Sequence, residues 1–167
     1  FDVRGSSRDQ RMWALEDFCS VLGVPAAAKY DATIERVRKA LRGLSTDPIA
    51  DLELLLRRAI FAWLIADGDM HLKNLALLKS ARLGSRAFTR VRLAPLYDAV
   101  STRVFPKLAH DRTALKLNGK DERLTRADFR SAATTLGLPV AKSDASCSEL
   151  ADALATHAPK LHLPAFA

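Results

Sequence analysis

Cysteine is nearly absent from this chain, which holds Cys19 and Cys147 among its 167 residues. Two isolated cysteines supply no disulfide framework, and the first residues carry no secretory signal pattern. Long apolar runs are lacking too, since the longest, Ala59 to Ala66, is far shorter than the roughly 20 residues that span a bilayer. These absences predict a protein of the reducing cytoplasm with no membrane partner.

Several common fingerprints of metal and phosphate sites are also missing. The histidines, His71, His110, His157 and His162, are scattered, and no cysteine lies near the first two, which argues against zinc. The alternating oxygen ligands and closing glutamate of a calcium-binding hand are not found. No nucleophile elbow and no glycine-rich phosphate loop occur. Any phosphate chemistry must therefore rest on other residues.

Acidic residues are outnumbered, because 26 lysines and arginines stand against 19 aspartates and glutamates and give a net charge of +7. The basic residues concentrate between Arg36 and Arg42 and between Lys79 and Arg92, an interval without any acidic residue. Such a surface is typical of nucleic-acid binding. Aromatics, at 7% of residues, form no stacking series beside these charges. A solvated helix face and a basic hairpin loop therefore explain the charges better, and nucleic-acid binding is the alternative interpretation.

The order of local signals predicts one mainly helical domain with a small pair of strands, and an apolar fraction of 49% suffices for its core. Asp47 and Pro48 start a long helix up to Ala66, with Leu56 and Trp63 on one buried face. The other predicted helices cover residues 14–22, 33–41, 125–136 and 146–157. After an extended entry over residues 1–13, the predicted strands cover residues 75–79, 91–96 and 113–117, the first two joined as a hairpin.

The stretch from Ile65 to Asn74 is the most informative, because Asp69 lies five residues before Asn74. This interval is that of a protein-kinase catalytic loop, where aspartate accepts the proton of the substrate hydroxyl and asparagine holds magnesium. Asp98 follows the apolar residues 93–97 and supplies the carboxylate that a second metal ligand requires. Lys73 offers a point charge to a phosphate.

Two alternatives remain open within this stretch. Asp67-Gly68-Asp69 is also consistent with an ordinary turn in which the aspartates bond to local backbone groups. His71 either orients the loop or contacts a nucleotide, and its position in the sequence does not separate these two roles. The aspartate-to-asparagine interval on its own is therefore a weak signal.

Five ordered motifs together resemble the HipA family of bacterial serine/threonine kinases, the toxin halves of toxin–antitoxin pairs. In chain order they are Phe1-Asp2, Leu15–Cys19 with Gly23 and Lys29-Tyr30, Trp63–Ile65 with Asp69–Asn74, Leu93–Ser101, and Ala114–Gly119 with Thr125–Phe129. They cover nearly the whole chain, so together they are far more specific than any one of them. The resemblance implies the C-terminal lobe of a protein-kinase-like fold, mainly helical with a small β-hairpin at the active site.

The resemblance also implies roles for individual residues. Asp69 would be the catalytic aspartate, and Asn74 and Asp98 would hold Mg²⁺. The residues implied to contact ATP are Phe1, Asp2, His71, Lys73, Asn74, Tyr97 and Asp98, with the first two at a hinge against adenine and ribose. The family further implies a DNA-binding HipB-like antitoxin, a protein substrate in translation, and an indirect contact with DNA.

One departure from the family limits these expectations. The family's preceding lobe supplies the loop over the phosphates and the lysine that anchors ATP, and neither is present in this sequence. Because Phe1 also replaces an initiator methionine, we expect residues 1–167 to be a C-terminal fragment that is inactive without its N-terminal lobe. The alternatives are a DNA- or antitoxin-binding module with a vestigial kinase site, or a small structural partner.

Overall fold

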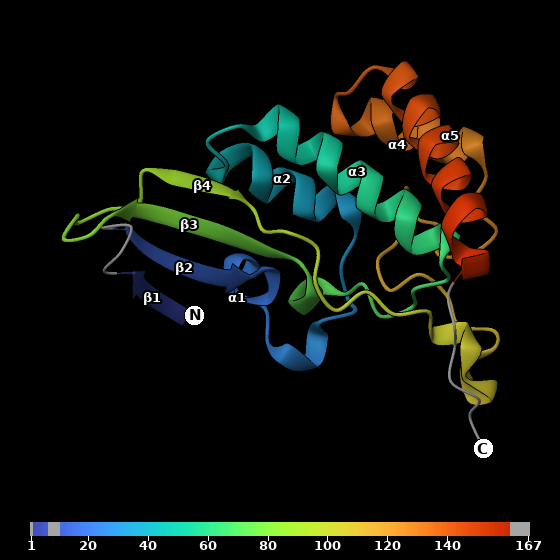
Figure 1. Ribbon diagram of the computed structural model, residues 1–167, viewed down its shortest axis with the longest axis horizontal. Helices are drawn as coiled ribbons and strands as arrows, with labels where there is room; N and C mark the ends of the chain where they lie inside the picture. Colours follow the sequence, from blue (N-terminus) through green and yellow to red (C-terminus); the bar gives the residue numbers. More distant parts are fainter. Residues whose placement is uncertain (1, 7–10, 161–167) are drawn as a thin grey trace.

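The computed structural model describes residues 2–6 and 11–160, and helices form most of their regular structure (Figure 1). The α-helices of this part are α1 (Phe18–Leu22), α2 (Ile34–Leu44), α3 (Pro48–Leu64), α4 (Arg126–Leu136) and α5 (Val140–His157). The strands are β1 (Asp2–Ser6), β2 (Arg11–Asp17), β3 (Ala76–Arg82) and β4 (Arg90–Leu93). Short 3-10 helices are η1 (Ala26–Ala28), η2 (Leu72–Asn74), η3 (Thr102–Val104), η4 (Pro106–Leu108) and η5 (Ala158–Lys160).

The strands form one antiparallel sheet in the order β1-β2-β3-β4. In Figure 1 this sheet lies at one end of the molecule beside α2 and α3, and α4 and α5 lie at the other end. The predicted hairpin is confirmed as β3 and β4, although its second strand ends at Leu93 rather than at residue 96. Pro95 follows two residues later, and a proline cannot donate a ladder hydrogen bond.

The helix predicted for residues 14–22 is wrong over its first half. Residues 11–17 form β2, which pairs with β1 on one side and with β3 on the other. Sheet pairing on both edges thus overrides a local helix propensity that Ala14, Leu15 and Glu16 favour. Only α1 remains helical, and it ends as predicted at Gly23, whose φ of 64° is left-handed.

Helix α3 is the central element, and it contacts α2, α4, α5 and β4. Asp47 caps it by accepting a hydrogen bond from the Ala50 N–H at 3.4 Å, and Pro48 is its first residue, as predicted. Leu56 is buried with 1% exposure, but the prediction that Trp63 is also buried is wrong. Trp63 lies on the last turn of α3, where its ring packs against the core and also lines surface pockets.

The C-terminal helices agree with the sequence expectations except at the start of the last helix. Thr125 and Asp128 form the predicted capping box of α4, which ends at Gly137 with a φ of 78°. The predicted start of the last helix at Ser146 is wrong, because α5 begins at residue 140 directly after a proline and buries Ser146 in its middle. The third strand predicted at residues 113–117 is also wrong, since that segment holds only isolated bridges.

The described residues contain no helix that is long and apolar enough to cross a membrane. Both cysteines are buried and unpaired. The apolar core lies between α2, α3, α4 and the adjoining face of the sheet. This core supports α3 from several sides, and α3 leads straight into the loop that carries the predicted site.

Candidate active site

The loop between α3 and β3 carries Asp69 and Asn74, and its first turn is tied to the chain that follows Asp98. Ala66 adopts a left-handed φ of 56°, and its carbonyl accepts hydrogen bonds from the Thr102 N–H at 3.0 Å and the Thr102 hydroxyl at 3.1 Å. The same hydroxyl accepts from the Gly68 N–H at 3.0 Å. Thr102, which sequence reasoning missed, therefore joins the two segments that hold the predicted base and metal ligand.

The backbone of Asp69 is held on both sides. Its N–H donates to Asp67 Oδ1 at 2.8 Å. Its carbonyl accepts from the Asn74 Nδ2 at 2.8 Å and from the His71 N–H at 2.7 Å. The Asp69 side chain stays 35% exposed, while Asn74 is buried. The predicted base and the predicted metal ligand thus belong to one closed loop, and the aspartate can still reach solvent.

Tyr30, from the segment after η1, reaches across to this loop. Its hydroxyl donates a hydrogen bond to Asp69 Oδ1 at 2.5 Å. That bond, followed by burial, raises the pKa of Tyr30 to about 12. The two residues are 39 positions apart in sequence, so no local spacing links them. The resemblance placed Lys29-Tyr30 in a matched segment, and that was the one signal pointing to this residue.

His71 is turned inward beneath Asp69. It is buried, its Nε2 lies 3.6 Å from Asp69 Oδ1, and its ring meets the Tyr30 ring edge-on with centroids 5.0 Å apart. Burial lowers the pKa of His71, and the negative charge of Asp69 opposes this shift in part. A buried imidazole in this position favours orienting the loop, which is one of the two roles that the sequence left open.

Lys73 and Tyr97 lie on the outer side of the loop. The Tyr97 hydroxyl donates to the Lys73 carbonyl at 2.8 Å, which ties residues 93–98 to the loop. The Lys73 ammonium is exposed and lies 3.7 Å from Asp17 Oδ2. Asp17 also caps α1 by accepting from the Ser20 N–H at 3.0 Å. The lysine that was predicted to meet a phosphate is therefore paired with a carboxylate at the end of β2.

Asp98 is exposed and has a φ of 54°, a left-handed conformation that aspartate tolerates better than most residues. Its charge acts on the pKa of Asp67 and on that of His71, so it lies close to the loop. The pKa of Asp67 is raised mainly by burial, and the charges of Asp69 and Asp98 add to this effect. Asp98 thus adds negative charge to the surroundings of Asp67 and His71.

The oxygen donors of Asn74 and Asp98 are of the kind that magnesium prefers. Among residues 2–6 and 11–160, no three or more His, Cys, Asp or Glu side chains gather as a metal cluster. Magnesium needs no such cluster, since it keeps several waters and uses one or two carboxylates with substrate phosphates. Asn74 uses Nδ2 in its bond to Asp69, so its amide oxygen is the atom left for a cation. Asn74 and Asp98 therefore suit a magnesium site of this open type.

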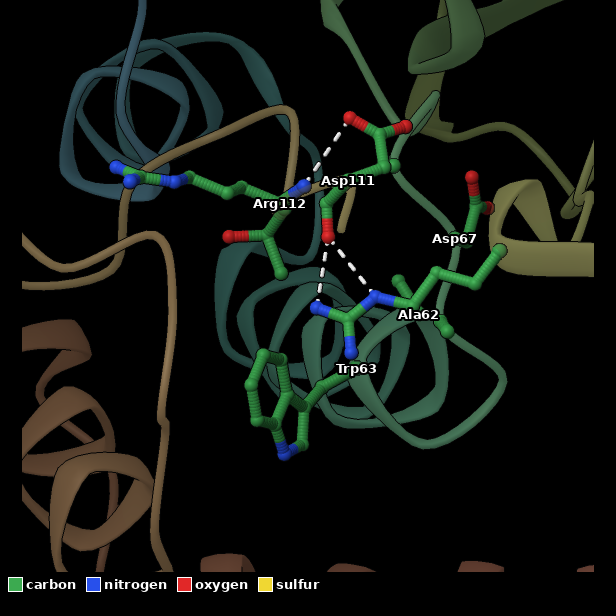
Figure 2. Close-up of a pocket in the computed structure, with 9 residues that line it drawn as sticks. Ala62, Trp63, Asp67, Asp111 and Arg112 are labelled. Carbon is green, nitrogen blue, oxygen red and sulfur yellow. Dashed lines mark hydrogen bonds between the residues drawn. The ribbon is translucent and has the colours of Figure 1, made fainter. Parts of the chain in front are cut away.

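A pocket lies behind the turn, between the end of α3 and residues 103–113. Figure 2 shows Ala62 and Trp63 on one side of it and Asp111 and Arg112 across from them. The Arg103 guanidinium donates two hydrogen bonds to the Asp111 carbonyl at 2.9 and 2.7 Å. A Cβ added at Gly68 would lie 2.1 Å from Asp111 Oδ2. The residue before Asp69 must therefore be glycine if Asp111 is to keep this place.

Of the two predicted hinge residues, the structure describes the backbone of Asp2. Phe1 lies outside the described residues. Asp2 is the first residue of β1 and pairs with Leu15 of β2. One strand, β2, therefore separates its backbone from β3, the strand that follows the loop of Asp69 and Asn74 in the chain.

The loop, the sheet and the helices together define a known class of domain. The HipA-like C-terminal domain family matches residues 1–160, and the chain belongs to this family. Two curated proteins of Sinorhizobium fredii strain NGR234 are similar in sequence. One, named "Putative kinase Y4mE", is 36% identical over 98 residues, which are 56% of this chain and 22% of that protein. The other, named "Putative kinase Y4dM", is 39% identical over 88 residues, which are 53% of this chain and 20% of that protein.

Among solved structures, a chain from the complex of HipA, HipB and operator DNA of the Shewanella oneidensis MR-1 toxin–antitoxin system has the same fold. The TM-score is 0.74 at 20% sequence identity, over 98% of this chain and 42% of that chain. This chain thus spans less than half of its structural relative and about a fifth of each curated relative.

Proposed function

We propose that this chain is the C-terminal catalytic lobe of an ATP- and Mg²⁺-dependent serine/threonine protein kinase of the HipA type. The observation that carries the proposal is the closed loop in which Asn74 donates to the Asp69 carbonyl, with Asp98 close enough for its charge to act on Asp67 and His71 of the same loop. Phosphoryl transfer needs a base, metal ligands and little else from such a lobe. The family membership and the kinase names of the two curated relatives support the same activity.

Each residue of the site would have a separate role in phosphate transfer. Asp69 would accept the proton of the substrate hydroxyl, and Asn74 and Asp98 would hold Mg²⁺. When bound, the metal would neutralise charge that builds up on the phosphate oxygens. Lys73 would leave Asp17 to meet a phosphate, because a lysine on an exposed surface changes partner at low cost. Tyr97 and His71 would hold the loop, and Phe1 and Asp2 would contact adenine and ribose.

The remaining parts of the proposed enzyme would come from other polypeptide segments or partners. An N-terminal lobe would supply the loop over the phosphates and the ATP-anchoring lysine, consistent with relatives that are longer than this chain. A HipB-like antitoxin, and operator DNA through it, would be the regulatory partners, as in the assembly of the structural relative. The protein substrate would belong to translation.

The test uses the natural gene product that contains this chain, with labelled ATP, Mg²⁺ and an extract that contains the translation machinery. We expect phosphate to enter protein, and Asp69→Asn to reduce this transfer by about 10²–10⁴-fold without loss of the fold. Asp152→Asn is the matched control, because it makes the same chemical change on the exposed outer side of α5. Near-normal transfer by Asp69→Asn would remove the base assignment.

A second candidate function, a polyanion-binding module with a vestigial kinase site, is favoured by the far end of the sheet. Arg11 of β2 lies directly opposite Arg82 of β3, and two like charges in this position destabilise a sheet. Arg86 on the β3–β4 connection and Arg90 at the start of β4 continue the exposed basic surface. Within the part of the chain that the structure describes, no ion pair of these four arginines is found, so their charge is free to meet phosphates.

Salt dependence separates the two functions. A module that uses all four arginines on duplex DNA should show a slope of log K against log salt of about −3 to −4, since each neutralised phosphate contributes about −0.9. Replacing Arg82 and Arg86 by glutamine should flatten that slope while phosphate transfer stays unchanged. DNA binding without any transfer by the natural gene product would favour the binding module over the kinase.

A further inference from the structure

Tyr30 makes a contact that neither the family membership nor the predicted site explains. Its hydroxyl donates to Asp69 Oδ1 at 2.5 Å, the shortest range for a hydrogen bond to a carboxylate. This places an aromatic side chain of a distant segment on the carboxylate that is proposed to act as the base. This hydrogen bond can orient Asp69 during the reaction only if the Tyr30 side chain is itself held in place.

The Tyr30 ring is held from more than one side. It stacks edge-on against the buried His71 ring at an interplanar angle of 72°. The Lys29 ammonium lies 4.9 Å from the Tyr30 ring centroid, within cation–π range. The Lys29 carbonyl accepts a hydrogen bond from the Leu72 N–H at 3.1 Å, which ties this backbone to the loop. Tyr30 therefore moves with the loop although it is 45% exposed.

The two oxygens of Asp69 have different surroundings as a result. Oδ1 accepts from the Tyr30 hydroxyl and lies 3.6 Å from His71 Nε2. For Oδ2, no hydrogen bond is found to any of the residues that the structure describes. A carboxylate bound through one oxygen has a fixed rotamer and presents the other oxygen in one direction. A general base must reach within about 2.6–3.2 Å of the proton that it takes, so this direction matters.

We propose that Tyr30 is a positioning residue of the catalytic base, which orients Asp69 through Oδ1 so that Oδ2 faces the acceptor hydroxyl. This inference rests on the proposed kinase function and adds to it a residue from outside the catalytic loop. The raised pKa of Tyr30, about 12, agrees with it, because the phenol keeps its proton and stays a donor across the pH range of the reaction.

The first experiment compares Tyr30→Phe with Tyr30→Ala in the natural gene product. Phenylalanine keeps the ring on His71 and under Lys29 and removes only the hydroxyl, whereas alanine removes both. We expect both variants to lose about ten- to a hundredfold in the maximal rate of phosphate transfer, as misplacement of a reacting group by up to about 1 Å does. The ATP concentration at half-maximal rate should stay unchanged in Tyr30→Phe. The melting temperature should fall for Tyr30→Ala and stay constant for Tyr30→Phe.

The second experiment combines Tyr30→Phe with Asp69→Asn. A residue that acts through Asp69 has nothing left to orient in the Asp69→Asn protein, so adding Tyr30→Phe should cause no further loss. If the losses of activity of the two single variants multiply in the double variant, Tyr30 acts by a route other than Asp69. That result would overturn the proposal. Full activity of Tyr30→Phe would overturn it as well, since the ring alone would then suffice.

The same samples also test another interpretation of the contact, in which Tyr30 is a substrate of the reaction. If Tyr30 were itself the acceptor hydroxyl, mass spectrometry of the wild-type protein after reaction would find phosphate on Tyr30, and this result would overturn the positioning role. An unmodified Tyr30 together with the loss in Tyr30→Phe supports it. Failure of the wider function looks different, because the wild-type protein would then transfer no phosphate to any protein at all.

Discussion

Backbone strain near the site is concentrated in single residues. Ala66 and Asp98, on the two segments that Thr102 joins, both have positive φ values, of 56° and 54°. A left-handed conformation costs a residue with a Cβ roughly 1–2 kcal/mol. Such strain persists where the surrounding structure enforces it, and it is enriched at ligand and active sites. At Ala66 the enforcing contacts are the two hydrogen bonds from Thr102 to its carbonyl.

Ala66→Gly should therefore stabilise the protein. Glycine adopts this φ without steric cost, and the hydrogen bonds of the backbone carbonyl are kept, so we expect a gain of about 0.5–1 kcal/mol in the free energy of unfolding. The measurement is denaturant unfolding of both proteins. Ala145→Gly is the control, since position 145 is exposed in the middle of α5 and glycine there should cost about 1 kcal/mol. A loss at position 66 would mean that its φ is not left-handed.

His71 should make stability depend on pH. Its pKa in the folded protein lies below the ordinary value of 6.5, mainly because of burial and with a contribution from the Lys29 charge, while Asp69 and Asp98 act in the opposite direction. The unfolded chain therefore binds the proton first as pH falls. Stability should decrease as pH drops below about 6.5, until the folded pKa is passed, and stay level above that.

The measurement for His71 is the melting temperature of the wild-type protein and of His71→Gln between neutral and mildly acidic pH. Glutamine does not titrate. The melting temperature of the wild-type protein should therefore fall relative to that of His71→Gln as pH drops through this range. His110→Gln is a control at an exposed histidine of the same chain. Parallel curves for wild type and His71→Gln would show that His71 does not carry the acid sensitivity.

At the scale of elements, a buried carboxylate fastens α3 to β4. Asp51 is 1% exposed and accepts from the Ser45 hydroxyl at 2.5 Å, the Arg92 Nε at 3.0 Å and the Leu93 N–H at 3.0 Å. Two turns further along α3, the buried Arg58 donates to the Ala94 carbonyl. Both contacts hold the start of the segment that leads to Asp98, so α3 positions the Asp69–Asn74 loop at its end and residues 93–98 along its side.

Asp51→Ala should cost about 3 kcal/mol in the free energy of unfolding, because it leaves a buried N–H and a guanidinium without their acceptor. The measurement is again denaturant unfolding. Glu53→Ala is a matched control on the same helix. Its carboxylate pairs with the Lys142 ammonium at 3.1 Å near the surface, and such pairs contribute at most about 1 kcal/mol. Equal losses for the two variants would contradict the fastening role of Asp51.

Sequence reasoning succeeded where a local signal decides the structure. The caps of α3 and α4 and the left-handed glycines at the ends of α1 and α4 all lie where expected. It failed for β2, whose conformation depends on pairing with strands far away in the chain. It also failed for Trp63, because helical periodicity gives the direction of a side chain and not whether another element covers it.

The same distinction applies to the candidate site. The spacing of Asp69 and Asn74 in one loop is local, and the motif before Asp98 could be recognised by resemblance. The contacts of Tyr30, Thr102 and Asp111 join segments tens of residues apart, and no periodicity or spacing in one sequence carries such information. The residues that hold the loop were therefore missed, whereas those predicted to do the chemistry were named.

At the scale of the whole molecule, the chain contains enough of its own core to fold but only part of the proposed nucleotide site. Its apolar cluster runs from α1 and α2 through α3 to α4 and α5, which satisfies the requirement for an independent core. Phosphate positioning in kinases also needs a loop over the phosphates and a lysine that pairs with them. Neither motif occurs in this sequence, and in the proposed enzyme both belong to the N-terminal lobe.

Residues 1–167 as a separate polypeptide should therefore fold, bind ATP weakly and transfer no phosphate. A cooperative thermal melt would show folding, and titration of ATP with and without Mg²⁺ would measure the weak binding. Adding an N-terminal lobe from the natural gene product as a second polypeptide should restore transfer, because the missing half of the clamp would then be supplied. Restoration should depend on Asp69, so the Asp69→Asn polypeptide is the control. Sustained transfer by residues 1–167 alone would contradict the two-lobe proposal, since the phosphate loop and its lysine would then have to lie within this chain.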